Sequence, residues 1–260
     1  MRFRRNLLGS FLSFVVVIGV WQAIISFGHV APYVAPTPLD AWRSIVTNWS
    51  HLWPLTLATV KETLFGFVAG ATLGMGLGIL LSKRRFVQRV IYPILILSQA
   101  IPIIALAPPL VLVLGFGLTP KVVIVAWIVF FPVTVSVLDG LANVDRDLLT
   151  LARAYGASPW RTFLVIEVPS ASTSLFSGLK IGATYAVTGA IIGELAASSG
   201  SSLAMFQHSQ SAQLDAAGVY GTTLIMTAVG MSWFGVVALV EFFTTPWKRR
   251  SVARRAGRHI

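Results

Sequence analysis

Six long apolar stretches constrain the fold of this 260-residue chain more than any other feature of its sequence. About 20 apolar residues in a helix cross the hydrocarbon layer of a bilayer. Inside that layer each backbone N–H and C=O needs a partner within the protein, and a helix supplies it within one segment. The six stretches are Leu7–Phe27, Thr63–Ser82, Val90–Leu114, Val122–Leu138, Leu175–Leu195 and Val219–Phe243. The sequence therefore predicts an all-α, multi-pass membrane protein with about six transmembrane helices.

Composition supports this class, because 55% of the residues are hydrophobic and only 11% are charged. No low-complexity linker interrupts the chain, so we expect a single transmembrane domain over residues 1–260. The first stretch follows a basic segment, as in signal peptides, but it is longer than the usual signal core of roughly 7–15 residues. We therefore expect it to be retained as a span.

The third stretch is the least regular of the six. Four prolines interrupt it, namely Pro93, Pro102, Pro108 and Pro109. Such breaks persist in a membrane where neighbouring helices or water satisfy the freed carbonyls. The pattern predicts a span that faces protein or a cavity. A merely kinked, lipid-facing helix is the alternative.

Positive charge is distributed unevenly along the chain. Of the 20 lysines and arginines, sixteen fall within residues 2–5, 83–89, 146–161 and 248–258. Six spans place these four segments on one side of the membrane, which the positive-inside rule makes cytoplasmic. Arg43 and Lys121 then lie in the opposite loops. We therefore expect a cell-membrane protein with both termini inside and a basic tail that binds anionic lipid, with no role in nucleic-acid binding.

Residues 139–170 are polar, and local signals there predict two short helices joined by a sharp corner. Asp145 is placed to cap the first helix, and Gly156 suits the left-handed residue that follows a helix. Ser158, followed by proline, caps the second helix, which we expect Pro169 to end. The apolar residues expected along the two helices are Leu148, Ala152 and Tyr155, then Trp160, Phe163 and Leu164. This elbow (residues 139–170) has the form of a docking piece for a partner in the adjacent aqueous phase.

The sequence offers no constellation typical of an enzyme or a metalloprotein. It contains no cysteine, and its four histidines are scattered over loops and the tail without metal-ligand spacing. It also lacks a nucleophile elbow, a zinc-protease motif and a phosphate-binding P-loop. We expect no catalytic residue, cofactor or metal in this chain. Any ATP that drives transport must then bind another chain.

Ionisable and polar residues within the spans are the candidates for a translocation path. These are Gln99, Lys180, Tyr185, Thr188 and Glu194, with Ser98, Thr134, Ser136 and Thr184 as further polar groups. Lys180 either extends to the inner membrane surface or binds a ligand. Glu194 either gates the path or is a carboxylate at the outer interface. One sequence does not determine which way these side chains face.

Two segments outside the membrane carry local signals. Thr37 and Asp40 have the spacing of a capping box, and the helix after them has apolar residues on one side: Leu39, Trp42, Ile45, Val46 and Trp49. We expect that helix to lie at the outer bilayer interface. Residues 196–218 are long, polar and nearly uncharged, which is typical of a lid, a partner-facing loop or a plain connector.

Small residues recur at helical spacing in two spans. The glycines concerned are Gly66, Gly70 and Gly74 in the second span, and Gly178, Gly182, Gly189 and Gly193 in the fifth. Glycine at this spacing lets two helix backbones approach closely. We therefore expect both spans to pack tightly against neighbours.

The elbow also carries a spaced motif of alanine, glycine, isoleucine and proline: Ala152, Gly156, Ile166 and Pro169. This pattern resembles the cytoplasmic loop of importer-type ABC permeases, which reads E-A-A, three residues, G, nine residues, I-x-L-P. Thr150 stands at the glutamate, Leu151 at the first alanine and Val168 at the leucine. The resemblance implies a loop that couples the permease to ATPases, with these residues: Ala152, Tyr155, Gly156, Ser158, Trp160, Ile166 and Pro169.

The likeness extends over residues 36–247. The run from Gln99 to Pro108, with Gly115 and Gly117, is similar to the nitrate/sulfonate/taurine branch, especially permeases proposed for pyrimidine precursors of thiamine and for riboflavin. The family implies a type I importer permease fold, a permease dimer (here expected as a homodimer), two cytoplasmic ATPase subunits and an external solute-binding protein. The alternatives are a stand-alone proton- or ion-coupled transporter, which calls for paired carboxylates or histidines in mid-membrane, and an intramembrane enzyme.

Overall fold

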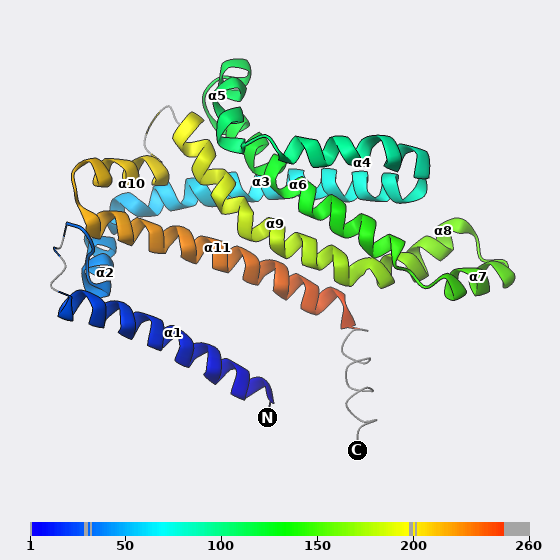
Figure 1. Ribbon diagram of the computed structural model, residues 1–260, viewed down its shortest axis with the longest axis horizontal. Helices are drawn as coiled ribbons and strands as arrows, with labels where there is room; N and C mark the ends of the chain where they lie inside the picture. Colours follow the sequence, from blue (N-terminus) through cyan, green and yellow to red (C-terminus); the bar gives the residue numbers. More distant parts are fainter. Residues whose placement is uncertain (1, 29–30, 32, 198–199, 201, 247–260) are drawn as a thin grey trace. The chain divides into compact units, whose positions relative to one another are not determined.

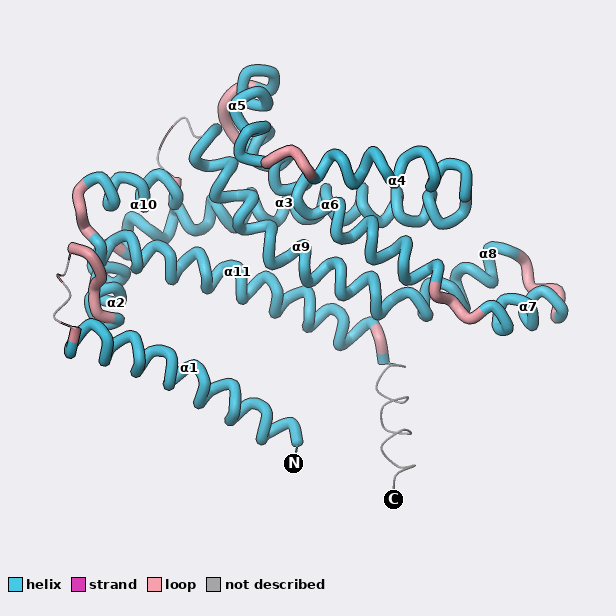
Figure 2. The backbone as a smooth tube through the Cα atoms, viewed as in Figure 1, coloured by secondary structure: helices cyan, strands magenta, loops and turns pink. Residues whose placement is uncertain are grey.

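A computed structural model of the chain describes residues 2–28, 31, 33–197, 200 and 202–246. Every regular element among these residues is a helix (Figures 1 and 2). The helices are α1 (Arg2–Phe27), α2 (Pro38–Thr47), α3 (Trp49–Lys83), α4 (Arg85–Gln99), α5 (Ile103–Leu114), α6 (Leu118–Ala142), α7 (Arg146–Ala154), α8 (Pro159–Thr162), a π-helical segment (Phe163–Glu167), α9 (Val168–Ala197), α10 (Leu203–Ala212) and α11 (Ala216–Thr244). The all-α fold expected from the sequence is confirmed.

Four helical segments in the described residues are long and apolar enough to cross a membrane: α3, α6, the run Pro159–Ala197, and α11. The bent pair of α4 and α5 makes a fifth if it counts as one span. The stretch expected at residues 7–27 falls in α1, whose apolar described part, Val16–Phe27, is shorter than a span. The structure thus supports four or five of the six expected spans. The basic tail at residues 248–258 lies outside the described residues.

The expected third span is two helices in the structure. The α4 and α5 axes meet at 97° across a short break. Pro102 lies at the start of α5 in an extended conformation, with φ −59° and ψ 121°, where its missing N–H interrupts no helix. Proline therefore breaks this segment more sharply than the kink that a single span could accommodate.

The chain packs as two compact units, and the larger consists of Thr59–Ser199 with Ala228–Ile260. Its core forms around α6, which contributes four fully buried valines and isoleucines: Ile124, Val125, Val129 and Val133. The two rows of regularly spaced glycines, here called the glycine seams of α3 and α9, both pack on this helix. A Cβ added at Gly70 of α3 would lie 2.6 Å from the Ala126 carbonyl oxygen, and one at Gly178 of α9 would lie 2.8 Å from that of Pro132. The glycine spacing thus correctly predicted close packing of both spans.

The smaller unit consists of Met1–Ala58 with Gly200–Thr227. The capping box that begins α2 is confirmed, because Thr37 and Asp40 exchange hydrogen bonds. The expected apolar side of α2 needs one correction: Ile45 is buried against Gly221 of α11, whereas Leu39, Trp42, Val46 and Trp49 are exposed. Gly221 allows this crossing, since an added Cβ would meet the Ala41 carbonyl oxygen at 2.9 Å.

The second outer segment, residues 196–218, is more ordered than a loop. It contains the helix α10, which the side chain of Ser202 caps by accepting a hydrogen bond from the Met205 N–H. The ring of Phe206 on this helix packs against the ring of His51 at the start of α3, with ring centroids 5.4 Å apart. The polar composition of this segment is thus that of an exposed helix.

Candidate functional site

The elbow has the local geometry expected from its capping signals. The side chain of Asp145 accepts a hydrogen bond of 2.9 Å from the Asp147 N–H at the start of α7. Gly156 follows α7 in the left-handed conformation, with φ 71°. The side chain of Ser158 then accepts from the Arg161 N–H at 3.3 Å and begins α8. These three residues set the corner between α7 and α8, which Figure 1 shows beyond the ends of α6 and α9.

The surface of the elbow is apolar and exposed. No residue of α7 is buried. The large apolar side chains that face away from the protein are Leu148, Leu151, Tyr155, Trp160, Leu164 and Val165. Tyr155 is 83% exposed and Trp160 is 68% exposed, next to the Gly156 corner. Exposed apolar patches of this kind mark interaction surfaces.

Pro169 does not end a helix, contrary to expectation. The chain continues from α8 through the π-helical segment into α9, where the Val168 N–H bonds to the Phe163 carbonyl five residues earlier. The wider π turn shifts the hydrogen-bond register just before Pro169, so that the proline is accommodated near the start of α9. The second arm of the elbow and the span that follows are therefore one continuous helical run.

A charged contact holds the π-helical segment against α3. The ammonium of Lys83, at the end of α3, forms an ion pair with Glu167, and it lies 4.7 Å from the ring centroid of Phe163. Both contacts connect α3 to the junction between the elbow and α9. Since the Lys83 side chain is 46% exposed, the pair contributes more to orientation than to stability.

Gln99 and Tyr185, two of the predicted path residues, lie on one cavity of about 320 Å³. This cavity opens at the break between α4 and α5 and is walled by Trp127 and Phe131 of α6. The broken span thus faces a cavity, as the proline pattern predicted. The side of the cavity formed by α9 also contributes Ile181.

One face of α9 continues from this cavity as a row of exposed hydroxyl groups: Thr173, Ser177, Thr184, Tyr185 and Thr188. Thr134 and Ser136 do not share this environment. Thr134 is fully buried and donates to the Phe130 carbonyl, and Ser136 lies where α6 crosses Gly178. Of the further polar candidates, these two belong to helix packing.

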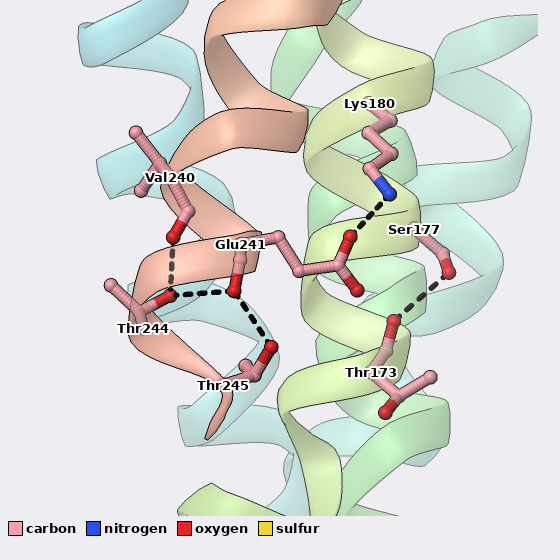
Figure 3. A network of polar contacts seen from close by, with 7 residues as sticks. All are labelled: Thr173, Ser177, Lys180, Val240, Glu241, Thr244 and Thr245. Carbon is pink, nitrogen blue, oxygen red and sulfur yellow. Dashed lines mark hydrogen bonds and ion pairs between the residues drawn. The ribbon is translucent and has the colours of Figure 1, made fainter. Parts of the chain in front are cut away.

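Lys180 is part of an ion pair inside the unit. Its ammonium contacts the Glu241 carboxylate of α11, and the Glu241 carbonyl accepts hydrogen bonds from the hydroxyls of Thr244 and Thr245 (Figure 3). The Lys180 and Glu241 side chains are 27% and 11% exposed. Lys180 is thus neutralised in place and does not extend freely to the membrane surface. Glu241 was missed by the sequence analysis, although a carboxylate inside an apolar span was itself a signal.

Glu194 is fully buried in a second polar cluster. It accepts a hydrogen bond of 2.5 Å from Thr59, and its carboxyl group lies beside that of Glu62. Glu62 in turn accepts from the Lys121 ammonium at 2.7 Å. Lys121 therefore lies buried in the first turn of α6, which corrects its expected place in a loop. The cluster joins α3, α6 and α9 three residues before α9 ends at Ala197, so the carboxylate pair lies near a helix end and away from mid-membrane.

Comparisons with known proteins agree with this arrangement. Residues 66–245 match the family described as binding-protein-dependent transport system inner membrane component. The chain is 34% identical over 240 residues to a probable ABC transporter permease protein of Haemophilus influenzae, covering 92% of this chain and 97% of that protein. It is 33% identical over 246 residues to the formylaminopyrimidine transport permease protein ThiX of Halalkalibacterium halodurans, covering 92% and 95%. Further relatives are named for riboflavin, aliphatic sulfonates and taurine, so the expected branch is confirmed.

The fold has a counterpart among solved structures. The chain superposes on a chain of the MetNI methionine ABC transporter in inward-facing conformations with a TM-score of 0.60 and 18% identity, covering 74% of this chain and 98% of that one. At this identity the likeness concerns the fold alone, and it confirms the expected type I importer permease fold. The chain therefore belongs to the family of binding-protein-dependent transport system inner membrane components, the multi-pass permease subunits of ABC importers.

Proposed function

We propose that two copies of this permease form the translocation path and that their elbows dock two cytoplasmic ATPase subunits. Membership of the family implies ATPase and binding-protein partners. The observation that carries the elbow assignment is the exposed apolar surface around Tyr155, Gly156 and Trp160, which nothing in the described chain covers. In this arrangement the elbow, the N-terminus and the C-terminus are cytoplasmic, in agreement with the charge distribution. The basic tail then lies at the inner leaflet.

The route from the ATPase to the membrane is a continuous helical run. Pro159–Ala197 comprises 39 residues. At about 1.5 Å per residue it extends roughly 58 Å from the elbow corner to the far end of α9. An ATPase that moves Trp160 thus moves the helix that carries the hydroxyl row. The ion pair of Lys83 with Glu167 transmits the same displacement to α3.

The hydroxyl row of α9 supports pairing of two permeases. Ser177 and Thr184 donate their hydroxyl protons to carbonyls of α9 itself, but the row of five exposed polar side chains still favours contact with water or another protein chain over lipid. A second copy that faces this row would enclose an aqueous path between two α9 helices. The homodimer is the simplest assembly with such a path, because one chain then supplies both walls.

The substrate that fits this lining best is a small, uncharged molecule with hydrogen-bonding groups. Lys180 supplies no free positive charge for an anion, since Glu241 neutralises it. The cavity beside it presents the Gln99 amide and the Tyr185 ring among apolar side chains. A heteroaromatic solute can stack on Tyr185 and bond to Gln99. Relatives named for formylaminopyrimidine and riboflavin support the same class of substrate.

Gly156→Val should uncouple transport from ATP hydrolysis. Valine is strongly disfavoured at φ 71°, by about 1–2 kcal/mol, and it adds a side chain at the docking corner. An added Cβ at Gly156 would meet no atom within 4 Å beyond its neighbours in the chain, so the variant should still insert and fold. The wild-type permease should co-purify with its ATPase and show ATP hydrolysis stimulated by the loaded binding protein. The variant should lose co-purification or stimulation.

Two results would contradict this proposal. Normal stimulation in Gly156→Val would remove the corner from the coupling route. Uptake that continues without any ATPase and follows a proton gradient would support a stand-alone transporter instead. Gly76→Val serves as the control, because Gly76 also has no atom within 4 Å but lies on α3 far along the chain from the elbow.

Neutralising both members of the Lys180–Glu241 pair should leave uptake of an uncharged solute largely intact. Lys180→Gln alone leaves the buried Glu241 carboxylate without its cation, so that variant should assemble less well. Lys180→Gln with Glu241→Gln removes both charges and should recover assembly. Uptake of radiolabelled formylaminopyrimidine by proteoliposomes that contain the whole importer measures this. If the double variant assembles normally but transports nothing, Lys180 is a substrate ligand and the proposed substrate class is wrong.

A further inference from the structure

One cleft in the smaller unit gathers the fixed charges of residues 31–58 and 200–227. Residues 31–58 and 200–227 contain only three aspartates, glutamates, lysines or arginines: Asp40, Arg43 and Asp215. All three line one cleft of about 510 Å³ between α2 and the turn from α10 to α11. Three charges on an otherwise uncharged surface, all at one cleft, point to a polar partner at this place.

Asp40 is held by the capping box with Thr37, whereas Arg43 and Asp215 are weakly engaged within the protein. Arg43 lies 3.9 Å from Asp40, with side chains 69% and 46% exposed, so the pair contributes little stability. One Asp215 oxygen accepts a hydrogen bond of 3.1 Å from the Gly218 N–H. Asp215 and the exposed Arg43 both line the cleft. Its formal charge is −1, which suits a partner that presents a basic group.

The apolar member of the cleft is held in an unfavourable backbone conformation. Leu214 has φ 56°, the left-handed region in which a side chain is disfavoured. It follows α10 at the position where glycine normally stands, and the next residue closes the helix end with a bond of 3.0 Å from the Asp215 N–H to the Gln210 carbonyl. Yet the Leu214 side chain is 70% exposed. A largely exposed leucine held at a glycine position points to a contact outside the chain.

The cleft side of α2 neighbours the side on which lipid contacts are expected. The exposed apolar side of that helix carries Leu39, Trp42 and Val46, whereas the cleft side carries Asp40 and Arg43. Successive residues turn by about 100° around a helix, so the two sides are distinct. The end of α9 that leads into α10 is also opposite to the end that begins at the elbow. With the elbow in the cytoplasm, the cleft opens to the outer aqueous phase.

We propose that this cleft, with Leu214 projecting from its rim, docks the external solute-binding protein on which importers of this family depend. The inference rests on the proposed function, because it requires an outer face and a binding protein. The partner element is a projecting loop that carries an apolar side chain against Leu214 and a basic side chain toward Asp215. The open, shallow cleft does not suit a small solute, which would remain largely exposed there. An anionic lipid headgroup is disfavoured by the net negative charge.

The test uses the permease–ATPase complex in nanodiscs, titrated with its own solute-binding protein. Leu214→Gly relieves the backbone strain, so its melting temperature should equal or exceed that of wild type, with unchanged basal ATP hydrolysis. Its affinity for the binding protein should nevertheless fall at least about tenfold, since the apolar contact of Leu214 with the partner is lost. A structural role for Leu214 would instead lower the melting temperature and leave the affinity unchanged.

Two further variants test the charged side chains of the cleft. Asp215→Asn keeps an oxygen that can accept from the Gly218 N–H, and Arg43→Gln removes only an exposed, weak pair. Asp215→Asn should lower the affinity and flatten its dependence on salt, whereas Arg43→Gln makes the cleft more negative and should raise the affinity. Leu39→Ala, on the neighbouring apolar side of α2, is the matched control and should bind like wild type.

The outcomes distinguish a failure of the proposed function from a failure of the docking site alone. A wild-type complex whose ATP hydrolysis does not respond to the binding protein overturns the proposed function and this docking site with it. A wild-type complex that responds, with Leu214→Gly and both charge variants indistinguishable from it, overturns the docking site alone. Cross-linking of a cysteine at position 214 to the bound binding protein should succeed, and a cysteine at position 39 should not cross-link.

Discussion

Lys121→Met should nearly abolish folded permease, because it leaves two carboxyl groups buried without their cation. The Glu62 and Lys121 side chains are 6% and 10% exposed, and Glu194 is fully buried. One oxygen of Glu62 already has no hydrogen-bond partner among the described residues. Removing one partner of a buried ion pair typically costs about 3–5 kcal/mol, because the remaining charge is uncompensated. That loss is a large part of the stability of an ordinary domain.

Thermal unfolding of detergent-purified protein, together with the yield of monodisperse material, measures this effect. Lys61→Met is the matched control, because Lys61 precedes Glu62 on α3 but its side chain is exposed. The control should unfold like wild type. Glu194→Gln should be milder than Lys121→Met, since an amide oxygen can still accept the hydrogen bond from Thr59. Equal melting temperatures for Lys121→Met and wild type would show that the cluster contributes nothing to stability.

The parts of the fold that follow from local chemistry were predictable from the sequence. The apolar stretches located the helices, and Thr37, Asp145 and Ser158 marked helix starts because each cap involves residues only two or three positions away. Gly156 marked the corner because its left-handed conformation is a property of one residue. Local signals also misled at Pro169, since a proline ends a helix unless an upstream π turn accommodates it.

The partners within the site were not predictable, because they are far apart in the chain. Thr59 and Glu194 are 135 positions apart, and Lys180 and Glu241 are 61 apart. A single sequence does not tell which spans are neighbours, so it could not show that Lys180 is neutralised. Leu214 carries no sequence signal either, because the left-handed residue after a helix is usually glycine and a leucine does not indicate one.

The packing of the glycine seams was only partly predictable from the sequence. Their spacing predicted close packing, but it did not predict which helix they contact. In the structure the seams of α3 and α9 both meet α6. This explains why Val125, Val129 and Val133 of α6, which meet these glycines, are fully buried. It also means that a change of one methyl group in α3 is felt by the helix that holds both Lys121 and the wall of the Gln99 cavity.

Gly74→Ala should therefore destabilise the permease strongly, whereas Gly76→Ala, two residues away on the same helix, should be neutral or stabilising. An added Cβ at Gly74 would lie 2.5 Å from the Phe130 carbonyl oxygen and 3.0 Å from the Val133 Cβ. Both belong to the buried face of α6, so the two helices must separate, and overpacking of this kind costs about 1–3 kcal/mol or more. At Gly76 nothing lies within 4 Å. There alanine gains up to about 1 kcal/mol of helix propensity without a clash.

Thermal unfolding of the two alanine variants side by side separates the effect of packing on stability from that of helix propensity. Both variants make the same chemical change in one helix. The melting temperature should fall for Gly74→Ala and stay equal or rise for Gly76→Ala. Separation of α3 from α6 should also widen the region around Phe131, so Gly74→Ala should lower uptake even in the fraction that remains folded. If both variants unfold at the wild-type temperature, α3 and α6 are not in the close contact on which the path geometry depends.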